Sequence, residues 1–394
     1  MEKTVIVSAT RTPFGKLLGC LESLNASDLG GIVIKEALNR AGIPGESVDH
    51  VLFGNVLQGG QGQVPSRQAT RKAGLPWEVS SITVNKVCSS GIITIALADQ
   101  AIRCGDYNIM IAGGMESMSN APYYVDAGAR KGLRMNDTKF VDLCVHDGLW
   151  CAFYDRHMAI HGSEVAKEYG ISREEQDDWA LRSQMLAVDA MKAGRLKDEI
   201  VSVTIPRKKG DPQIIDTDEA PRPDTTAEGL AKLPPIFIKD GSVTAGNAPG
   251  LNDGAGALVL MSESKAKELG IKPLATILGY AMVSQDAKYI PTVPGLSAMK
   301  LLKNLNMTFD DIDLIEANEA FAAVSLVSGK ITGWDPKKVN INGGAIAFGH
   351  PIGASGARIV MTLIYELRRR GGGKGIACIC SGAAQGDAMM ISVE

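Results

Sequence analysis

The sequence predicts an α/β fold made of two similar βα halves with a segment inserted between them. Residues 1–115 alternate short β-branched runs with longer amphipathic stretches, which is typical of strands alternating with helices. Residues 275–394 show the same alternation. Residues 117–247 are instead rich in Met, Gly, Tyr and charged residues and contain one clear helix. These three observations favour a layered fold with an insertion.

The elements of the first half follow from short apolar runs. Strands are predicted where β-branched residues cluster, and one helix where apolar residues recur every three to four positions. The predicted strands are 4–9, 50–55, 82–87 and 107–114, and the predicted helix is 27–42. This order predicts a mostly parallel sheet flanked by helices.

The last part of the chain repeats this order and its spacing. The predicted elements are helix 295–307, strand 313–318, strand 339–344, helix 354–371 and strand 375–380. Cys88 lies 33 residues after Asn55, and His350 lies 32 residues after Asn318. We interpret this as two copies of one βα unit, with Cys88 and His350 at equivalent loop-to-helix corners that face the boundary between the halves.

The middle segment reads as an insertion. Its helix begins at a capping box, Ser172 with Glu175, and continues to residue 194. We therefore expect three parts: residues 1–117 plus 248–270 form the first half, residues 118–247 the inserted loop domain, and residues 271–394 the second half.

Composition excludes several classes of protein. With 45% hydrophobic residues and 22% charged residues the chain is globular, and a net charge of −3 argues against nucleic-acid and membrane partners. No apolar run is expected to reach the roughly 18 residues that cross a bilayer, and the N-terminus reads as a strand, not a signal peptide. Seven cysteines with no disulfide-type spacing indicate a reducing, cytoplasmic location.

Cys88 is the first candidate for chemistry. It follows an apolar strand in VNKVCSSG and precedes a helix, so its sulfur should face the helix N-terminal amides. Their partial positive charge can lower a thiol pKa from about 8.5 towards 7 or below. A lone cysteine is equally often a small buried hydrophobic residue, so both interpretations stay open on this evidence.

His350 and Cys380 are the next candidates. His350 lies in the glycine-rich loop NGGAIAFGHPIGASG, where backbone can approach a ligand closely; alone it could be a surface or structural histidine. Cys380 ends the last predicted strand, and its CxC spacing with Cys378 lacks the second ligand pair of a zinc site, so we expect no metal. A cysteine–histidine pair is what nucleophilic thiol chemistry needs.

Four motifs together resemble the thiolases. They are VCSSG at Cys88, NEAFA at Asn318, GGAIAFGHPIGASG at His350 and CSG at Cys380, in the order and spacing of that family. IVSATRTPFGK, GGMESMSNAPY and VTAGNAPGLNDGA resemble it too, so the resemblance covers the whole chain and is nearest to acetyl-CoA C-acetyltransferases. It implies a thiolase-like fold, two duplicated βα domains in an α-β-α-β-α core, and a homotetramer built as a dimer of dimers.

The resemblance also implies roles for five residues. Cys88 would take an acetyl group from acetyl-CoA as a thioester, and Cys380 would act as base and acid. His350 and a water held by Asn318 would donate to the enolate oxygen, while the amides of Cys88 and Gly382 would hold the tetrahedral oxyanion. Coenzyme A thioesters would be substrates, with no tightly bound cofactor.

The inserted domain would bind coenzyme A. The resemblance places Arg222 at the adenine end, although a solvated loop charge is the alternative for that residue. The other implied contacts run along the pantetheine and near the thioester: Phe237, Ala245, Pro249 and Leu251, and then His157, Met158 and Phe321. Pro249 stands where many acetyl-specific members have a serine, so one hydrogen bond is lost there.

Other departures from the family pattern concern acyl-chain preference. Ile290 replaces a methionine and Pro291 a glycine, His161 takes a small-residue position, and Ala383 and Ala384 replace two glycines. Condensation of two acetyl-CoA molecules is therefore weighed against thiolysis of longer 3-ketoacyl-CoA in fatty-acid oxidation. A silent acyl-CoA-binding scaffold would lack a nucleophile or base. A condensing enzyme for carrier-protein substrates would have a histidine in place of Asn318.

Overall fold

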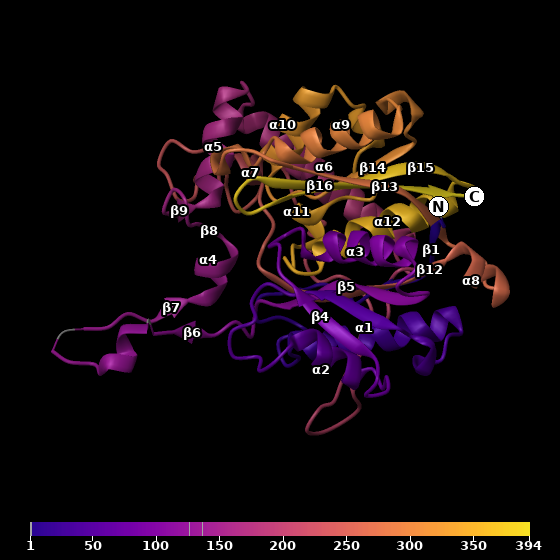
Figure 1. Cartoon of the computed structure of the whole chain (residues 1–394). Helices are drawn as coiled ribbons and strands as arrows, with labels where there is room; N and C mark the ends of the chain where they lie inside the picture. Colours follow the sequence, from indigo (N-terminus) through magenta and orange to yellow (C-terminus); the bar gives the residue numbers. More distant parts are fainter. Residues whose placement is uncertain (1, 126, 136) are drawn as a thin grey trace.

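The computed structural model describes residues 2–125, 127–135 and 137–394. The described chain forms five layers in which helices and sheets alternate (Figure 1). This confirms the predicted α/β class and the layered core. Cys88 and His350 precede the helices of the middle layer, whereas Asn318 and Cys380 lie at the ends of strands.

The first half contributes one part of the large sheet. Its strands are β1 (Thr4–Arg11), β2 (Gly15–Lys16), β3 (His50–Gly54), β4 (Ser80–Val84), β5 (Ile109–Ser117) and β12 (Asn252–Ser262). β3 pairs in parallel with β4 and β5, whereas β5, β12 and β1 pair antiparallel in turn, and β2 pairs with β12.

The second half repeats this arrangement. Its strands are β13 (Ala275–Ser284), β14 (Leu314–Ala317), β15 (Gly373–Ser381) and β16 (Gln385–Val393). β14 pairs in parallel with β15, and β15, β16 and β13 pair antiparallel. β13, β14, β15 and β16 therefore correspond to β1, β3, β5 and β12. The two halves join where β1 meets β13 over two residue pairs, Val5 with Thr276 and Ile6 with Ala275.

Two sequence-based expectations about strands are wrong. The sheet is mixed and not mostly parallel, because β12 and β16 return beside β5 and β15 in the opposite direction. The segment 339–344 forms only an isolated bridge between Ile315 and Val339. Asn340 there has a positive φ of 48°, and its side chain bonds both the N–H and the C=O of Ala317, which takes the place of strand pairing.

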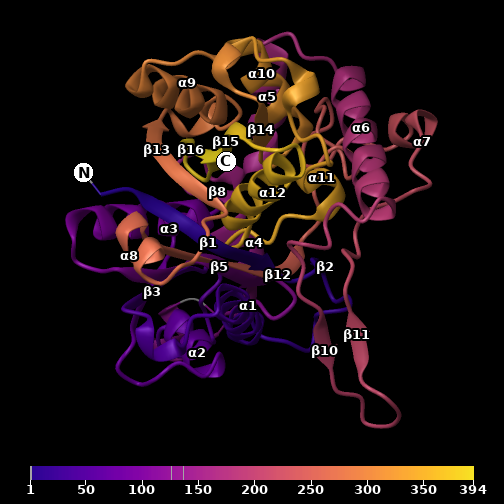
Figure 2. The ribbon, with the colours of Figure 1, turned by 90° about the vertical axis from the view of Figure 1, so that its right-hand side faces the viewer.

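Helices form the other three layers. The middle layer is α3 (Ser90–Cys104) and α12 (Ser355–Arg369). The outer layers are α1 (Ala26–Ala41) with α2 (Pro65–Lys72) on the first half, and α9 (Val293–Leu305) with α10 (Ala322–Thr332) on the second (Figures 1 and 2). The predicted helices at 27–42, 295–307 and 354–371 are thus present.

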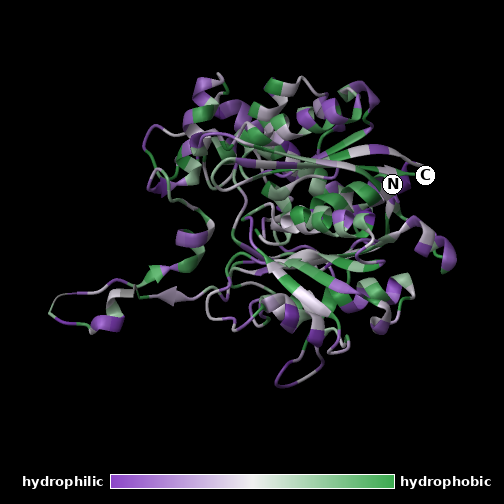
Figure 3. Cartoon of the chain, in the orientation of Figure 1, coloured by the Kyte–Doolittle hydropathy of each residue, from purple (hydrophilic) through white to green (hydrophobic). Residues whose placement is uncertain are grey.

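The middle helix α3 is apolar along its length. The stretch Val87–Cys104 has 18 residues and a mean hydropathy of 1.2, which by length and composition alone could cross a membrane, contrary to expectation. However, 67% of it is buried inside the protein, between the two parts of the large sheet, and Figure 3 colours much of this helix as hydrophobic. A helix covered by sheets on both sides must be apolar all round, which accounts for the pattern.

Glycines bring the N-termini of α3 and α12 together. A Cβ on Gly91 would lie 2.7 Å from the Ala357 nitrogen, and one on Gly356 would lie 2.4 Å from the Ile92 nitrogen. Only glycine permits such backbone contact. We call this contact between α3, α12 and their preceding loops the seam; it places the Cys88 and His350 corners side by side.

The inserted segment covers one end of the seam. Its helices are α4 (Leu143–Gly148), α5 (Met158–Glu168), α6 (Arg173–Lys192) and α7 (Ala227–Ala231). Its strands are β6 (Tyr123–Tyr124), β7 (Val141–Asp142), β8 (Trp150–Cys151), β9 (Arg156–His157), β10 (Val203–Ile205) and β11 (Gln213–Ile215). The capping box predicted at Ser172 and Glu175 begins α6. The exact domain boundaries given above stay predictions.

Two arms project from the body. Residues 121–125, 127–135 and 137–142, which we call the tongue, extend sideways in Figure 1 and include β6, β7 and the 3-10 helix Ala127–Lys131. The β10–β11 hairpin extends downward in Figure 2. The remaining elements are α8 (Glu263–Glu268), α11 (Ala345–Phe348) and the 3-10 helices Gly45–Ser47, Ala287–Tyr289, Phe309–Asp311 and Pro336–Lys338.

Candidate active site

Cys88 lies at the turn between β4 and α3. Val87 adopts a positive φ of 46°, which is costly for a β-branched residue and turns the chain sharply. The hydroxyl of Ser90 holds this turn, because its Oγ accepts from the N–H of Lys86 at 2.8 Å and donates to the C=O of Val87 at 2.7 Å. Cys88 is 2% exposed and lines a cavity. The predicted corner position is therefore present.

The expected lowering of the Cys88 pKa is wrong. Burial raises the pKa of this thiol to about 12, although the amides of Cys88 itself and of Gly382 lower it, and the carboxylate of Glu116 raises it further. Removal of the sulfur from water outweighs the helix N-terminus. In the substrate-free protein Cys88 is therefore a neutral thiol that needs a base.

His350 lines the same cavity as Cys88. The backbone N–H of His350 donates to Asn252 Oδ1 at 2.9 Å, and its ring Nδ1 lies 2.6 Å from Ser355 Oγ. Burial, helped by Arg358, lowers the pKa of His350 to about 3, so the ring is neutral. Ser355 Oγ also donates to the C=O of Pro351 at 3.0 Å, so it accepts from Nδ1–H of His350 and leaves Nε2 as the ring nitrogen without a proton.

Asn318 follows β14 and faces the other ring nitrogen of His350. Its Nδ2 lies 3.5 Å from His350 Nε2, and its N–H donates to the C=O of Cys378 at 2.9 Å. Its Oδ1 is buried with no hydrogen-bond partner among the described residues. A buried amide oxygen without a protein partner is a position where an ordered water belongs.

Cys380 comes from the far end of the chain and is fully buried behind Cys88. Burial, and then the nearby Cys88 sulfur, raise the pKa of Cys380 well above its usual value. Ser381 Oγ donates to the C=O of Lys86 at 2.5 Å, and Lys86 Nζ bonds Asp387 on β16 at 2.6 Å. These contacts fasten the Cys88 turn to the β15–β16 turn, so the two sulfurs and the Gly382 amide meet.

A cavity of ≈ 430 Å³ opens onto Cys88 and His350. All eight residues predicted to bind coenzyme A line it: His157, Met158, Arg222, Phe237, Ala245, Pro249, Leu251 and Phe321. Sequence reasoning missed the other lining residues, which are Met118, Val145, Leu149, Ile236, Ala248, Gly250, Ala320 and Ile352. These residues are small or apolar and scattered along the chain, so no motif marks them.

His157 and Phe237 form a stacked pair in this cavity. Their ring centroids lie 3.7 Å apart with an interplanar angle of 11°. His157 Nδ1 accepts from the N–H of Ala159 at 3.1 Å, and burial lowers the pKa of His157 to about 4. The neutral ring therefore carries its proton on Nε2, which is free to donate to a ligand.

A smaller cavity of ≈ 230 Å³ shares part of this wall and leads outward. The shared residues are Arg222, Ala245, Ala248, Gly250 and Leu251, and the smaller cavity adds Lys16. Two cationic side chains, Arg222 and Lys16, therefore line the smaller cavity. The larger cavity around Cys88 is mostly apolar, so the two cavities together suit a long anionic thioester.

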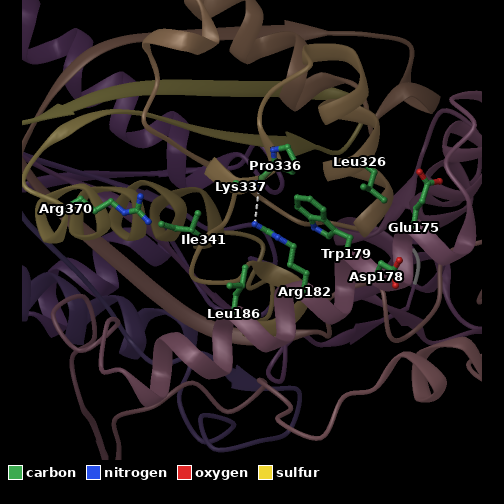
Figure 4. A pocket seen from close by; sticks show the side chains of 10 residues that line it. All are labelled: Glu175, Asp178, Trp179, Arg182, Leu186, Leu326, Pro336, Lys337, Ile341 and Arg370. Atoms are coloured by element: carbon green, nitrogen blue, oxygen red, sulfur yellow. Dashed lines mark hydrogen bonds between the residues drawn. The ribbon is translucent and has the colours of Figure 1, made fainter.

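A third pocket, of ≈ 640 Å³, is larger but separate (Figure 4). One stripe of α6 lines it, with Glu175, Asp178, Trp179, Arg182 and Leu186, and none of the predicted site residues does. Where the structure describes the chain, no three His, Cys, Asp or Glu side chains group in a way that could hold a metal ion.

Comparison with known proteins shows the family. Residues 4–264 match the thiolase N-terminal domain, and residues 271–393 match the thiolase C-terminal domain. The chain belongs to the thiolase family. The fold of this thiolase is also similar to that of the crystal structure of the Bacillus anthracis acetyl-CoA acetyltransferase, with a TM-score of 0.97 and 41% identity over 100% of this chain and 99% of that one.

Relatives of similar length share about half of their residues with this thiolase. The acetyl-CoA acetyltransferase of Pseudomonas aeruginosa is 50% identical over 392 residues, covering 100% of both chains. The acetyl-CoA acetyltransferase of Cupriavidus necator is 50% identical over 391 residues, covering 99% of both. The recognised motifs thus lie in a chain that matches these relatives over nearly all of their length.

Proposed function

We propose that this protein is an acetyl-CoA acetyltransferase. It joins two acetyl-CoA molecules into acetoacetyl-CoA and coenzyme A, and it also catalyses the reverse thiolysis. The observation that carries this proposal is that Cys88 and His350 line one cavity and that the buried Cys380 lies close enough to Cys88 for the two sulfurs to interact. Full-length relatives that carry this name add support.

The first step forms a thioester on Cys88. His350 Nε2 takes the Cys88 proton, and the resulting thiolate attacks the carbonyl carbon of acetyl-CoA. The amides of Cys88 and Gly382 both point at the Cys88 sulfur, so they are available to the tetrahedral oxyanion; one such donor is worth about 3 kcal/mol. The C–S bond to coenzyme A then breaks, and the departing thiolate takes the proton of Cys380.

The second step forms the carbon–carbon bond. The Cys380 thiolate removes an α-proton from a second acetyl-CoA. Its enolate oxygen receives hydrogen bonds from the protonated Nε2 of His350 and from a water held by the unpartnered Asn318 Oδ1. The carbanion attacks acetyl-Cys88 and the C–S bond breaks. The Cys88 thiolate then regains its proton from His350, so both thiols are restored.

Substrate binding follows the two joined cavities. The apolar part near Met158, Ile290 and Phe321 takes the acyl group, and His157 Nε2 donates to a carbonyl of the ligand. Arg222 and Lys16 take the nucleotide phosphates at the outer end. The protein acts as a homotetramer in the cytoplasm, a location supported by its seven free thiols.

Chain length tests the substrate. We expect coenzyme A-dependent cleavage of acetoacetyl-CoA to exceed that of 3-ketooctanoyl-CoA in kcat/KM, because Ile290, at 2% exposure, fills the wall of the acyl pocket. Clear preference for the longer substrate would assign this enzyme to fatty-acid oxidation instead.

Cys380→Ser tests the division of labour between the thiols. This variant should still acetylate Cys88 from acetyl-CoA, as measured by mass spectrometry, but lose condensation by at least about a thousandfold. Cys378→Ser, two residues away on β15, is the control and should keep both steps. Equal loss of both steps in Cys380→Ser would give that cysteine a structural role only.

A further inference from the structure

One buried carboxylate joins the two halves beside the active site. Glu116, on β5, is 0% exposed and accepts four hydrogen bonds. Its Oε1 accepts from Asn55 Nδ2 at 2.8 Å and from the N–H of Leu57 at 3.2 Å. Its Oε2 accepts from the N–H of Val56 at 3.1 Å and from the N–H of Gly353 at 3.0 Å. The first three donors belong to one half, and Gly353 belongs to the loop that carries His350.

The space around this contact leaves no room for a substitute. A Cβ on Gly353 would lie 2.5 Å from the Met115 oxygen and 2.8 Å from Glu116 Oε2. A Cβ on Gly114 would lie 1.9 Å from the Gly353 oxygen. The backbone of the His350 loop therefore lies directly on β5, and the Glu116 carboxylate supplies its hydrogen bond there.

The duplicated fold shows what Glu116 adds. Asn55 and Asn318 occupy equivalent positions after β3 and β14. Asn55 is fully bonded, because its Nδ2 donates to Glu116 and its Oδ1 accepts from Gln61 Nε2 at 3.2 Å, whereas Asn318 keeps a free Oδ1 for chemistry. In the first half the asparagine is therefore a structural residue with a fully bonded side chain. In the second half the equivalent asparagine is part of the candidate site.

The charge of Glu116 also reaches Cys88. All four of its partners are donors, an arrangement that favours the ionised carboxylate, although burial raises its pKa to about 7. That negative charge disfavours a thiolate at Cys88 and at the neighbouring buried Cys144. The other charged group that acts on Glu116 is Asp253.

We propose that Glu116 is a positioning residue whose four hydrogen bonds fix the His350 loop against the Cys88 half. This inference rests on the proposed function in taking Cys88 and His350 as the reacting pair. It extends that function by assigning a positioning role to a residue outside the cavity.

The pKa of Glu116 decides at which pH the test is made. Burial raises this pKa to about 7, although the amides of Leu57, Val56 and Gly353 lower it. The carboxylate is therefore ionised above pH 8, where its effect on Cys88 is largest. Alkylation of Cys88 by iodoacetamide, followed on the Cys88 peptide between pH 8 and pH 11, reports the ionisation of this thiol without using acetyl-CoA.

Two variants distinguish the effect of the charge of Glu116 from the effect of its side-chain length. Glu116→Gln keeps the length of the side chain and removes the charge, so Cys88 should be alkylated about threefold to tenfold faster at pH 9. Glu116→Asp keeps the charge and is too short to reach Gly353, so kcat for thiolysis should fall at least about tenfold without faster alkylation. KM should change little in either.

Glu319→Gln is the matched control. Glu319 is also fully buried and also accepts four hydrogen bonds. Its donors are Trp179 and Ser183 on α6, and Asn340 and Ile346 in the second half, so none of them belongs to the Cys88 half. Its alkylation profile at Cys88 should equal that of the wild type. The inference is overturned if Glu116→Asp keeps wild-type kcat. A Glu116→Gln alkylation rate equal to that of the wild type at every pH would support a role that consists of the hydrogen bonds alone. Failure of acetyl-CoA to acetylate wild-type Cys88 would instead sink the proposed function and leave the alkylation result readable.

Discussion

Two histidines that line the cavity are buried, and neither ring is hydrogen-bonded to a carboxylate of the described residues. His350 and His157 are 6% and 7% exposed, and burial lowers both pKa values, to about 3 and about 4. Among the described residues, the ring nitrogens of these histidines have close polar contacts to Ser355, Asn318 and the amide of Ala159. Both rings are therefore neutral at physiological pH, which a proton acceptor and a hydrogen-bond donor to substrate require.

This neutrality predicts a specific pH dependence of stability. The unfolded chain binds a proton at His157 below its ordinary pKa of 6.5, whereas the folded protein does so only near pH 4. The histidine therefore costs stability as pH falls from 6.5 to 4, by about 2 kcal/mol at pH 4.5. His157→Gln has no imidazole to protonate and therefore does not lose this stability. Between pH 7.5 and pH 4.5, the free energy of unfolding of the wild type should fall by about 2 kcal/mol more than that of the variant.

Urea unfolding of both proteins across this pH range is the measurement. The comparison must be between variants, because burial raises the pKa of Glu116 to about 7 and of Glu316 to about 8, which acts in the opposite direction in both proteins. Parallel stability curves would show that His157 protonates as readily in the folded protein as in the unfolded one.

Sequence patterns located these residues but not their ionisation. Cys88, His350, Asn318 and Cys380 each lie in a short motif, so position along the chain was predictable. The pKa of Cys88 depends on how completely α3, α12 and β15 close over the sulfur, which is a property of tertiary packing. A prediction from the helix N-terminus alone therefore had the wrong sign.

At the scale of elements, the turn between β15 and β16 carries the largest local strain near the site. Ala383 and Ala384 have positive φ values of 62° and 49°, a region that favours glycine. The preceding residue, Gly382, supplies the amide that bonds Cys88. The two alanines thus keep the backbone path that glycines would take, at a conformational cost.

Ala383→Gly should relieve part of this cost. The side chain of Ala383 is half-buried, and a glycine adopts a positive φ without penalty, so we expect the free energy of unfolding to rise by about 1 kcal/mol. Ala388→Gly, inside β16, is the control and should lower it by a similar amount. Chemical denaturation measures both, and a destabilised Ala383→Gly would mean that the methyl packing outweighs the strain.

The elements themselves were largely predictable, and the exceptions have physical causes. Helices α1, α9 and α12 and strands β1, β3, β5 and β15 follow from local periodicity. The antiparallel placement of β12 and β16 does not, because pairing direction depends on where a long connection returns to the sheet. The loss of a strand at 339–344 depends on the Asn340 side chain, which replaces backbone pairing.

At the scale of the whole molecule, duplication explains why the site lies at the seam. The corners of the two halves are equivalent, so Cys88 and His350 approach each other when α3 and α12 pack through their glycines. The inserted segment then closes one end of the seam and supplies the cavity walls. Each half alone would present one catalytic corner to solvent.

The tongue gives the whole molecule its most exposed apolar surface. Leu133, Met135 and Phe140 are 66%, 91% and 73% exposed on an arm that extends away from the body (Figure 1). Exposed apolar side chains on a projecting arm are typical of an interface between subunits. The proposed homotetramer accounts for them if the tongue of one subunit packs against another.

Replacing Met135 and Phe140 together by serine tests this role. We expect light scattering coupled to size exclusion to show the tetramer converted to dimers, while the subunits stay folded, because the arm makes few contacts with its own body. Ile214→Ser, on the other projecting hairpin and 65% exposed, is the control and should leave the tetramer intact. A double variant that remains a tetramer, or a wild-type protein that is smaller than one, would remove the tongue from the assembly and leave its exposed side chains to another partner.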